Sequence, residues 1–332
     1  MTAEANPAGI RVWVGGYTPT MGGTAAGISL LRLDGDGSLL ELLDTTRTSS
    51  PSYLATGAGG LLYATDEAGR IEAFRRGPGL SLKPLGGQPT SGGFPCHVSV
   101  SSDRLFVSNY RDGSLDIFPL TADGGVGHRV GTLAGSGSGP NTAQDGPHAH
   151  STLVIGSAVL SADLGADRVH VHRIVRGMLV REASVALPPG TGPRDLLAHA
   201  GRTILLSELG GTIFTLDDRA RIIAAGMIAE DWVEGDHAAG LAVDARGRFL
   251  YTGLRGSNRI AVVRSSDLSP VATVPCGGDW PRHVSVVGDV LLVANQLSST
   301  ITAFRIDSAT GIPRPLGSPV DVASPTFLLP VV

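Results

Sequence analysis

The sequence lacks the long apolar runs and the helical periodicity that would indicate a membrane span or an α-helical fold. No stretch approaches the roughly 18 apolar residues that a spanning helix needs, and apolar residues do not recur at helical spacing over a useful length. The first ten residues contain no basic segment followed by an apolar one, so a secretory leader is not expected. We therefore expect a cytoplasmic protein without a membrane partner.

Cysteine and lysine are scarce as well, and the chain carries no excess of positive charge. Cys96 and Cys276 are the only cysteines, and we expect buried thiols because a chain of this size can build a large core without a disulfide. Lys83 is the only lysine among 26 basic residues, which argues against a lysine nucleophile. The net charge is -4 and no basic stripe occurs, so nucleic acid is not an expected partner.

Glycine and proline, in contrast, are abundant and separate many short strands. The 332 residues include 46 glycines and 21 prolines, with 42% hydrophobic and 17% charged residues. Seven times, a short apolar strand ending in polar residues is followed by a turn and a second alternating strand. These pairs lie at 12–18 with 27–33, 61–73, 105–118, 159–171, 204–216, 250–262 and 292–304. Their starts recur every ~42 to 54 residues, which is the period of a β-propeller blade.

A further strand precedes each later pair, and the last such strand has no pair after it. These strands are expected at 51–56, 95–100, 147–154, 193–199, 239–243, 281–286 and 324–330. The first pair has no strand before it, so the two chain ends must share a blade. The sequence therefore predicts one all-β domain over residues 1–332, a seven-bladed β-propeller with four-stranded blades that is closed by pairing of the N- and C-terminal strands.

Antiparallel pairing places the start of each inner strand beside the end of the next strand, at one mouth of the central channel. Inner-strand starts bring the residues His97, His148, His150, Arg194, Arg282 and His283, with His237 just upstream of another. Second-strand ends bring Asp66, Glu67, Asn109, Tyr110, Asp163, Glu208, Arg255, Asn295 and Gln296. Five of the nine histidines and three arginines in one ring of positions indicate a functional site at this mouth.

Each of these groups also has a structural interpretation. His148 and His150 are two residues apart, so both imidazoles could point into the channel, or one could bond a neighbouring backbone group. A zinc site would need a third ligand such as His97 or His283, but no Glu or Cys lies at metal spacing. Asn109 and Asn295 are either turn residues or substrate contacts. The long segment 121–146, rich in Gly and Ser, is a candidate lid at the mouth.

The charged residues of the predicted mouth leave two interpretations open. Arg194 and Arg282 each follow a proline at the start of an inner strand, where a guanidinium could bind a carboxylate or phosphate or tie adjacent blades together. Glu208 and Arg255 end the second strands of consecutive blades and could form a bridge. Glu208 could instead act as a base if partial burial raises its pKa.

Taken in order along the chain, these motifs resemble the lactonase family of seven-bladed propellers, which includes propeller-type 6-phosphogluconolactonases and is related to carboxy-cis,cis-muconate cyclases. The matching segments are Val14-Gly15-Gly16-Tyr17-Thr18, Pro95-Cys96-His97, Val107-Ser108-Asn109-Tyr110, Gly146-Pro147-His148-Ala149-His150-Ser151, Asp163-Leu164-Gly165, Gly192-Pro193-Arg194, Ser207-Glu208-Leu209, Pro281-Arg282-His283 and Ala294-Asn295-Gln296. The resemblance implies a catalytic group of one His, two Arg and one Glu, which fall on His150, Arg194, Arg255 and Glu208. The sequence departs from the family pattern at Asp195, Ser207, Gly240 and Leu254, and these departures affect substrate identity.

The resemblance implies a metal-independent lactonase without a cofactor that acts on a small anionic lactone, with 6-phosphogluconolactone as the first candidate, in carbohydrate metabolism and the pentose phosphate pathway. Arg194 and Arg255 would hold the anion and the developing oxyanion, and His150 or Glu208 would activate water. We predict substrate contacts from His97, Asn109, His148, Arg282 and His283. The alternatives are a muconolactone-type cycloisomerase and a non-enzymatic propeller that binds a small anion or a protein. The protein is expected to be a monomer or a weak homodimer.

Overall fold

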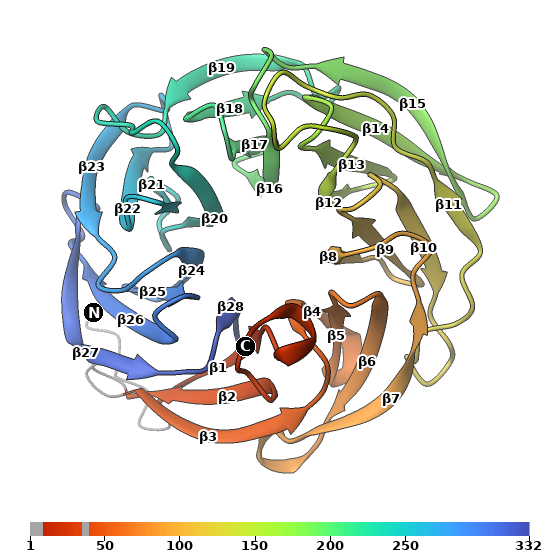
Figure 1. The fold of residues 1–332 in the computed structure, drawn as a ribbon, viewed down its shortest axis with the longest axis horizontal. Coiled ribbons are helices and arrows are strands. Elements are labelled where there is room, and N and C mark those ends of the chain that lie inside the picture. The colour runs from red at the N-terminus through yellow and green to blue at the C-terminus, as the bar shows by residue number, and fades with distance from the viewer. Residues whose placement is uncertain (1–8, 35–39, 332) are drawn as a thin grey trace.

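The protein forms a ring of seven four-stranded antiparallel sheets arranged around a central channel (Figure 1). The computed structural model describes residues 9–34 and 40–331, and most of the segment examined for a leader, residues 1–8, lies outside them. Seven blades of four strands were predicted, and this architecture is confirmed. Within the described ranges, no helix is long and apolar enough to cross a membrane.

Each blade runs from the channel to the rim in four strands. The innermost strands are β28 (Pro325–Pro330), β4 (Pro51–Gly57), β8 (Pro95–Val100), β12 (Ala149–Ile155), β16 (Pro193–His199), β20 (His237–Val243) and β24 (Pro281–Val287). The second strands are β1 (Ile10–Gly16), β5 (Leu61–Asp66), β9 (Arg104–Asn109), β13 (Ala158–Asp163), β17 (Arg202–Ser207), β21 (Phe249–Arg255) and β25 (Val290–Asn295).

The third strands are β2 (Gly27–Leu33), β6 (Arg70–Arg76), β10 (Leu115–Pro119), β14 (Arg168–Val175), β18 (Thr212–Leu216), β22 (Arg259–Arg264) and β26 (Thr300–Ile306). The rim is formed by β3 (Leu40–Arg47), β7 (Leu82–Pro89), β11 (Gly131–Leu133), β15 (Met178–Ala186), β19 (Ile222–Met227), β23 (Pro270–Pro275) and β27 (Pro313–Asp321). Three short 3₁₀ turns lie in the loops, η1 (Pro19–Met21), η2 (Ala58–Gly60) and η3 (Pro78–Leu80).

The chain ends close the ring by sharing one blade, as predicted. β28 pairs antiparallel with β1, where Trp13 is opposite Leu329 and Val14 is opposite Leu328. Leu328 is 1% exposed and packs in a core cluster with Val14 and Val290. The backbone ladder and this apolar burial together hold the last strand in place and leave no open inner edge at the seam.

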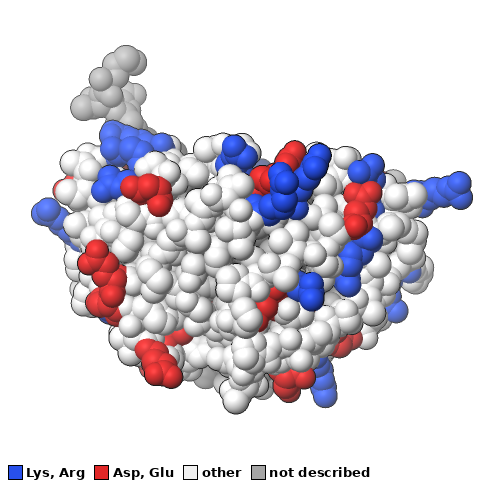
Figure 2. All heavy atoms as spheres, turned by 90° about the horizontal axis from the view of Figure 1, so that it is seen from above, with Lys and Arg blue, Asp and Glu red and all other residues white. Residues whose placement is uncertain are grey.

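Alternation of apolar residues explains why the blades stack on one another. Between the sixth and seventh blades, Tyr251 and Val262 of one sheet pack against Val293 and Phe304 of the next, and all four are at most 2% exposed. The thiols of Cys96 and Cys276 are free and buried in this β framework, as expected. Charged side chains of both signs are scattered over the visible side of the ring with large uncharged stretches between them (Figure 2).

The segment 121–146, a candidate lid from its sequence, contains a strand of the third blade. Its middle part supplies β11, the outer strand of the third blade, which pairs with β10 over three residues. The sequence could not show this strand because three residues carry too little alternation. After β11 the segment does return toward the mouth, where the buried Gln144 side chain donates to the Leu164 carbonyl at 2.8 Å and to Asp167 at 2.8 Å.

Candidate active site

A local irregularity in the inner strands creates the site. In β12, β16 and β24 the pairing register skips one residue close to the strand start, leaving His150, Arg194 and Arg282 without a cross-strand partner. The same interruption occurs at Ser52 in β4, and β20 skips the two residues Gly240 and Leu241. A bulge of this kind bends the strand and redirects a side chain. The bulges therefore place one unpaired side chain near the start of the inner strand in successive blades.

The skipped residues and their successors line one cavity at the channel. Its volume is about 150 Å³. The skipped residues around it are Ser52, Cys96, His150, Arg194, Gly240, Arg282 and Thr326. The residues that follow them, which also line it, are Tyr53, His97, Ser151, Asp195, Leu241, His283 and Phe327. Apart from Leu196 and Leu197, the lining of the cavity thus comes from two consecutive positions on each of the seven inner strands.

Gly240 shows how closely the inner strands approach one another. Its φ is +72°, and a Cβ at this position would lie 2.9 Å from the Cα of His283 and 2.7 Å from the backbone nitrogen of Val284. A larger residue would therefore displace the backbone of β24. The glycine at this departure from the family pattern therefore fits the close approach of β20 to β24.

The bulge in β12 sends the two histidines of the His-Ala-His motif into different surroundings. His150 is 7% exposed and lines the cavity. The ring of His148 stacks on Tyr110 with centroids 4.5 Å apart, and its Nδ1 lies 2.7 Å from the Tyr110 carbonyl oxygen. Of the two interpretations of this motif, the structure therefore shows the one in which one imidazole bonds a neighbouring backbone group. His148 lies outside the cavity wall, beside Asp145.

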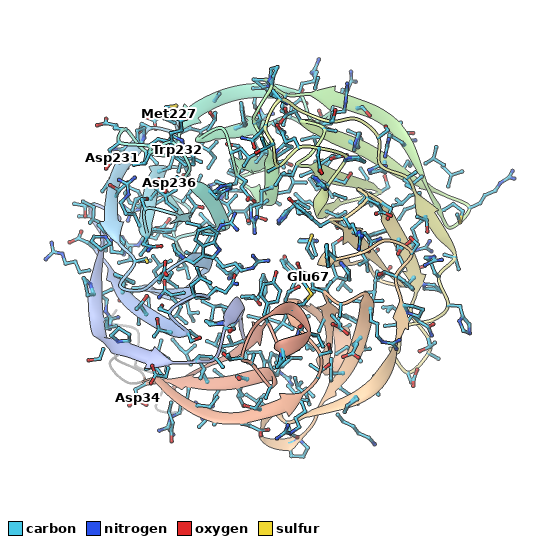
Figure 3. The ribbon with its side chains drawn as sticks, viewed as in Figure 1. Asp34, Glu67, Met227, Asp231, Trp232 and Asp236 are labelled. Atoms are coloured by element: carbon cyan, nitrogen blue, oxygen red, sulfur yellow. The ribbon has the colours of Figure 1, made fainter. Side chains whose placement is uncertain are left out.

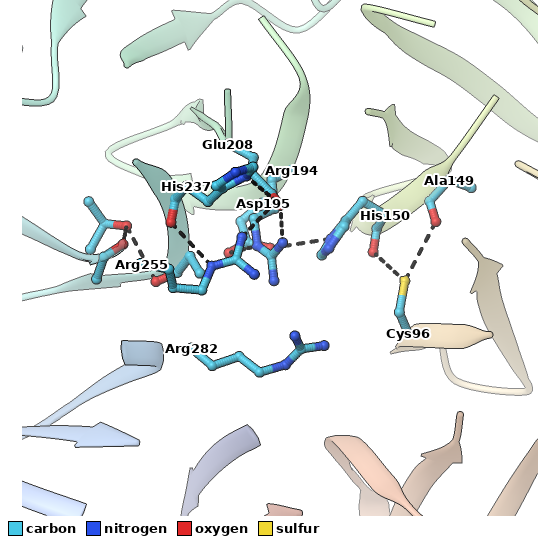
Figure 4. Close-up of polar contacts among 12 residues, drawn as sticks. Cys96, Ala149, His150, Arg194, Asp195, Glu208, His237, Arg255 and Arg282 are labelled. Atoms are coloured by element: carbon cyan, nitrogen blue, oxygen red, sulfur yellow. Dashed lines mark hydrogen bonds and ion pairs between the residues drawn. The ribbon is translucent and has the colours of Figure 1, made fainter. Parts of the chain in front are cut away.

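Glu208 holds two arginines of neighbouring blades in a buried cluster (Figure 4). Its Oε2 accepts a hydrogen bond from Arg194, and its Oε1 lies 2.7 Å from a guanidinium nitrogen of Arg255 and 3.2 Å from Nδ1 of His237. Burial alone would raise the pKa of this carboxyl, but Arg255 and Arg194 hold it well below its usual range. Burial lowers the pKa of Arg255 to about 10, with Glu208 opposing that shift.

Asp195 is the carboxylate that faces the cavity itself. Its side chain is 22% exposed, and its Oδ1 lies 3.8 Å from Nδ1 of His150 while its Oδ2 lies 3.9 Å from Nε of Arg194. Burial raises the pKa of Asp195 above 3.8, although Arg194 opposes the shift. Burial, with Arg194 adding to it, holds the pKa of His150 well below 6.5, so that this imidazole is neutral.

Arg282 lines the cavity from β24, two inner strands on from Arg194 of β16, and lies next to a second carboxylate. Its guanidinium donates to the Tyr17 hydroxyl and lies 4.8 Å above the Tyr17 ring. The Tyr17 hydroxyl in turn donates to Oε2 of Glu67 at 2.8 Å, whereas Arg282 is 3.8 Å from that oxygen. Glu67 lies near the channel at the inner part of the second blade (Figure 3). The Tyr17 hydroxyl therefore makes the close contact with Glu67. Arg282 lies farther from its nearest carboxylate than Arg194 and Arg255 lie from Glu208.

Aromatic rings form the rest of the wall. Tyr53 contacts His97 and Phe327, with centroids 4.2 Å and 4.1 Å apart, and Phe327 contacts His283 at 4.0 Å. Burial lowers the pKa of both His97 and His283 to about 3, so these imidazoles are neutral near pH 7. We define these four residues as the aromatic wall.

The structure brings the four predicted catalytic residues together, but it divides them between two layers. His150 and Arg194 line the cavity, whereas Glu208 and Arg255 form the cluster that holds Arg194 from outside. Of the predicted substrate contacts, His97, Arg282 and His283 line the cavity. Asn109 is fully buried behind it, where its side-chain nitrogen donates to Ser114 at 3.0 Å and Asp116 at 3.1 Å. Asn109 therefore performs the turn role that was its alternative.

Three residues of this region had no catalytic or substrate-binding role assigned from the sequence, although Glu67 was expected at the mouth. Asp195 was noted only as a departure from a family pattern, although its position after Arg194 could have indicated it. Tyr17 and Glu67 end equivalent segments of the first two blades, and only their joint contact with Arg282 reveals their role. In the described part of the chain, no group of three or more His, Cys, Asp or Glu residues has a geometry that could hold a metal ion.

Comparison with known proteins gives one consistent result. The family model described as "Lactonase, 7-bladed beta-propeller" matches residues 11–330. The chain is 29% identical to a 6-phosphogluconolactonase of Bacillus subtilis over 94% of this chain and 96% of the relative. A 6-phosphogluconolactonase of Formosa agariphila is 28% identical over 90% of this chain and 93% of the relative. The solved structure of a periplasmic gluconolactonase from Pseudomonas aeruginosa superposes with a TM-score of 0.91 at 29% identity, covering 97% and 99% of the two chains.

Proposed function

Because this chain belongs to the lactonase family of seven-bladed β-propellers, we propose that it hydrolyses 6-phosphogluconolactone to 6-phosphogluconate at the mouth of the central channel. As a member of this family the protein is a lactonase, and the proposal concerns which lactone it opens and where. The observation that carries it is the cavity of about 150 Å³ that Arg194 of β16 and Arg282 of β24 line from two blades that are one blade apart in the ring.

Two separated guanidiniums fit a substrate with two sites of negative charge. Arg282 keeps its nearest carboxylate at 3.8 Å and would bind the phosphate, because a guanidinium matches phosphate geometry. Arg194 would face the lactone carbonyl and stabilise the oxygen as it becomes negative during attack by water. Glu208 and Arg255 do not line the cavity; they would act by fixing the orientation of Arg194.

The aromatic wall would hold the sugar ring between these two charges. Nδ1 of His97 and Nδ1 of His283 each accept a backbone N–H at 3.3 Å, which leaves their Nε2 atoms for the substrate. Tyr53 and Phe327 add apolar ring surface of the kind against which C–H groups of a sugar pack. A cavity with polar groups on one side and aromatic groups on the other favours a single orientation of the substrate.

Hydrolysis of a lactone panel tests the substrate. Opening a lactone releases a carboxylic acid, which a pH-stat measures directly against the spontaneous rate. We expect kcat/KM for 6-phosphogluconolactone to exceed that for unphosphorylated gluconolactone by at least ~10-fold, and the variant Arg282→Gln to abolish that preference, because a charged hydrogen bond contributes roughly 1.5–3 kcal/mol. Equal turnover of both lactones by the parent would reject the phosphorylated substrate. Isomerisation of muconolactone without acid release would identify a cycloisomerase.

We further propose a cytoplasmic location, in the carbohydrate metabolism that produces sugar-phosphate lactones, and a monomeric or weakly dimeric state. The periplasmic name of the Pseudomonas relative makes the location worth testing. Cell fractionation that recovers the protein with periplasmic markers would contradict the cytoplasmic assignment. Light scattering that gives a mass of three or more chains would contradict the proposed oligomeric state.

A further inference from the structure

The reaction proposed above needs a base that touches water in the cavity, and Glu208 is poorly suited to that role. One carboxylate oxygen accepts from Arg194, and the other faces Arg255 at 2.7 Å and His237 at 3.2 Å. Glu208 does not line the cavity. Its pKa, held well below the usual range by Arg255 and Arg194 against the effect of burial, leaves a carboxylate that accepts a proton weakly.

His150 is the other base suggested by the sequence, and its surroundings also weaken it. The imidazole lines the cavity, but burial and the charge of Arg194 hold its pKa well below 6.5. Its Nδ1 points toward Asp195 at 3.8 Å. A neutral imidazole of this kind is a better hydrogen-bonding partner for substrate than a proton acceptor.

Asp195 combines the position in the cavity wall that Glu208 lacks with a raised pKa, whereas the pKa of His150 is lowered. It lies on β16 directly after the bulged Arg194, lines the cavity and keeps 22% of its side chain exposed. Its distances of 3.8 Å to His150 and 3.9 Å to Arg194 exceed hydrogen-bonding range, so neither neighbour occupies a carboxylate lone pair. The backbone N–H of Gly240 interacts with the carboxylate, which retains other acceptor sites.

We propose that Asp195 is the general base of the lactonase, which removes a proton from the attacking water beside the guanidinium that receives the oxyanion. This assignment rests on the proposed function. Asp195 accepts a proton as the water oxygen bonds to the carbonyl carbon, and the carbonyl electron pair moves to the oxygen facing Arg194. The intermediate then breaks its ring C–O bond, and Asp195 returns the proton to the departing ring oxygen. One water is consumed, and a carboxylic acid and a hydroxyl group are formed.

The charge surroundings of Asp195 support this role. The titratable groups that influence or face it are Tyr53, Cys96, His150, Arg194, Glu208 and Arg255. Burial dominates among these influences and raises the pKa of Asp195 above 3.8, which strengthens it as a base. The other cavity imidazoles, His97 and His283, have pKa values lowered to about 3 by burial. Asp195 is therefore the cavity acid whose titration moves toward neutral pH.

The test uses the lactone that the parent hydrolyses fastest and the isosteric variant Asp195→Asn, with Glu208→Gln as the comparison carboxylate. The base must be ionised, so activity of the parent falls as pH drops through the raised pKa of Asp195. We expect Asp195→Asn to lower kcat by ~10²- to 10⁴-fold and to remove this acidic limb. Glu208→Gln should retain the limb. Formate or acetate should restore part of the rate of Asp195→Ala and none of that of Glu208→Ala.

The outcomes separate this assignment from the proposed function. An active parent whose Asp195→Asn variant melts normally and keeps kcat within about threefold, with its acidic limb in place, would overturn the role of Asp195 alone. If Asp195→Asn does not fold, the rate of Asp195→Ala with and without formate tests the role of Asp195 instead. An Asp195→Ala variant whose rate formate does not increase would count against that role. A parent that hydrolyses no lactone of the panel would overturn the proposed function and the role of Asp195 with it.

Discussion

The two sides of the cavity arise from equivalent positions on equivalent strands, yet their chemistry differs. On one side, the carboxylate of Asp195 lies 3.8 Å from the imidazole of His150 and 3.9 Å from the guanidinium of Arg194. At these distances the groups keep hydrogen-bonding capacity for a ligand. On the other side, the aromatic wall packs ring against ring at 4.0–4.2 Å. The bulge repeated in the inner strands creates equivalent positions around the cavity. The residue type at each position determines whether it is suited to the reaction or to substrate orientation. The charged side is suited to reaction, and the aromatic wall is suited to orientation.

After loss of the Asp195 carboxylate, removal of a guanidinium from the charged side should have the largest effect. We expect Arg194→Ala to lower kcat/KM by ~10²- to 10³-fold, because it deletes the group that faces the developing oxyanion. Arg264→Ala, in which an arginine at the end of the third strand β22 with a 52% exposed side chain is lost, is the matched control and should keep the parent rate. Steady-state kinetics with melting curves make the comparison. A folded Arg194→Ala variant with the parent kcat/KM would show that Arg194 only ties two blades together.

Neutralising the carboxylate behind that guanidinium should have a smaller effect. Glu208→Gln keeps the side-chain shape but loosens Arg194 and Arg255, and we expect a loss in kcat/KM of ~10²-fold, about 2.7 kcal/mol. Because Glu208 holds two cations, its loss is also expected to lower the melting temperature more than Arg264→Ala does. Parent-like kinetics in this variant would remove Glu208 from the site.

The sequence predicted the fold well and the site only in outline, for a physical reason that particular residues illustrate. The blade period and the strand without a partner at 324–330 are properties of the whole chain, and they predicted the ring and its closure. The separation of His148 from His150 depends on a bulge, which a period-two pattern does not reveal. The supporting residues Glu208 and Arg255 lie at or directly after the ends of second strands, and only their contacts show that they hold Arg194 from outside the cavity.

Asp195 illustrates the same limit for chemistry. A resemblance carries roles over position by position, and at position 195 it implied a different residue. Only distances show that the carboxylate of Glu208 is enclosed by cations while that of Asp195 faces the cavity. The contact between Tyr17 and Glu67 could not be predicted either, because it joins residues 50 positions apart.

A change in the aromatic wall should alter substrate binding more than catalysis. Tyr53→Leu removes the ring that contacts both His97 and Phe327, and each aromatic contact contributes roughly 0.5–1.5 kcal/mol. We expect KM to rise by ~3- to 10-fold with kcat little changed, whereas changes on the charged side act mainly on kcat. Initial-rate measurements over a range of substrate concentrations separate the two constants. A fall in kcat with unchanged KM would contradict the division between the two sides.

Truncation after Ala323 tests closure apart from chemistry. It deletes β28, exposes the inner edge of β1 and removes the buried side chains of Phe327 and Leu328, each worth roughly 1.5–3 kcal/mol. We expect the melting temperature to fall by several degrees. Scanning calorimetry on the parent and the truncated chain measures the shift, and an unchanged melting curve would refute the closure argument.

Chelation should have the smallest effect of all. Neither side of the cavity offers a set of metal ligands among the described residues, so exhaustive treatment with EDTA should leave lactone turnover unchanged. Turnover that is lost with EDTA and recovered with a divalent cation would require a metal in the reaction.

The most direct test of the central claim is the position of the product 6-phosphogluconate in crystals of the protein. We expect the phosphate to lie within hydrogen-bonding distance of Arg282 and the new carboxylate to lie between Arg194 and Asp195, with the carbon chain against the aromatic wall. Product bound at the rim of the blades, or in the cavity without contact to either arginine, would contradict the proposed site.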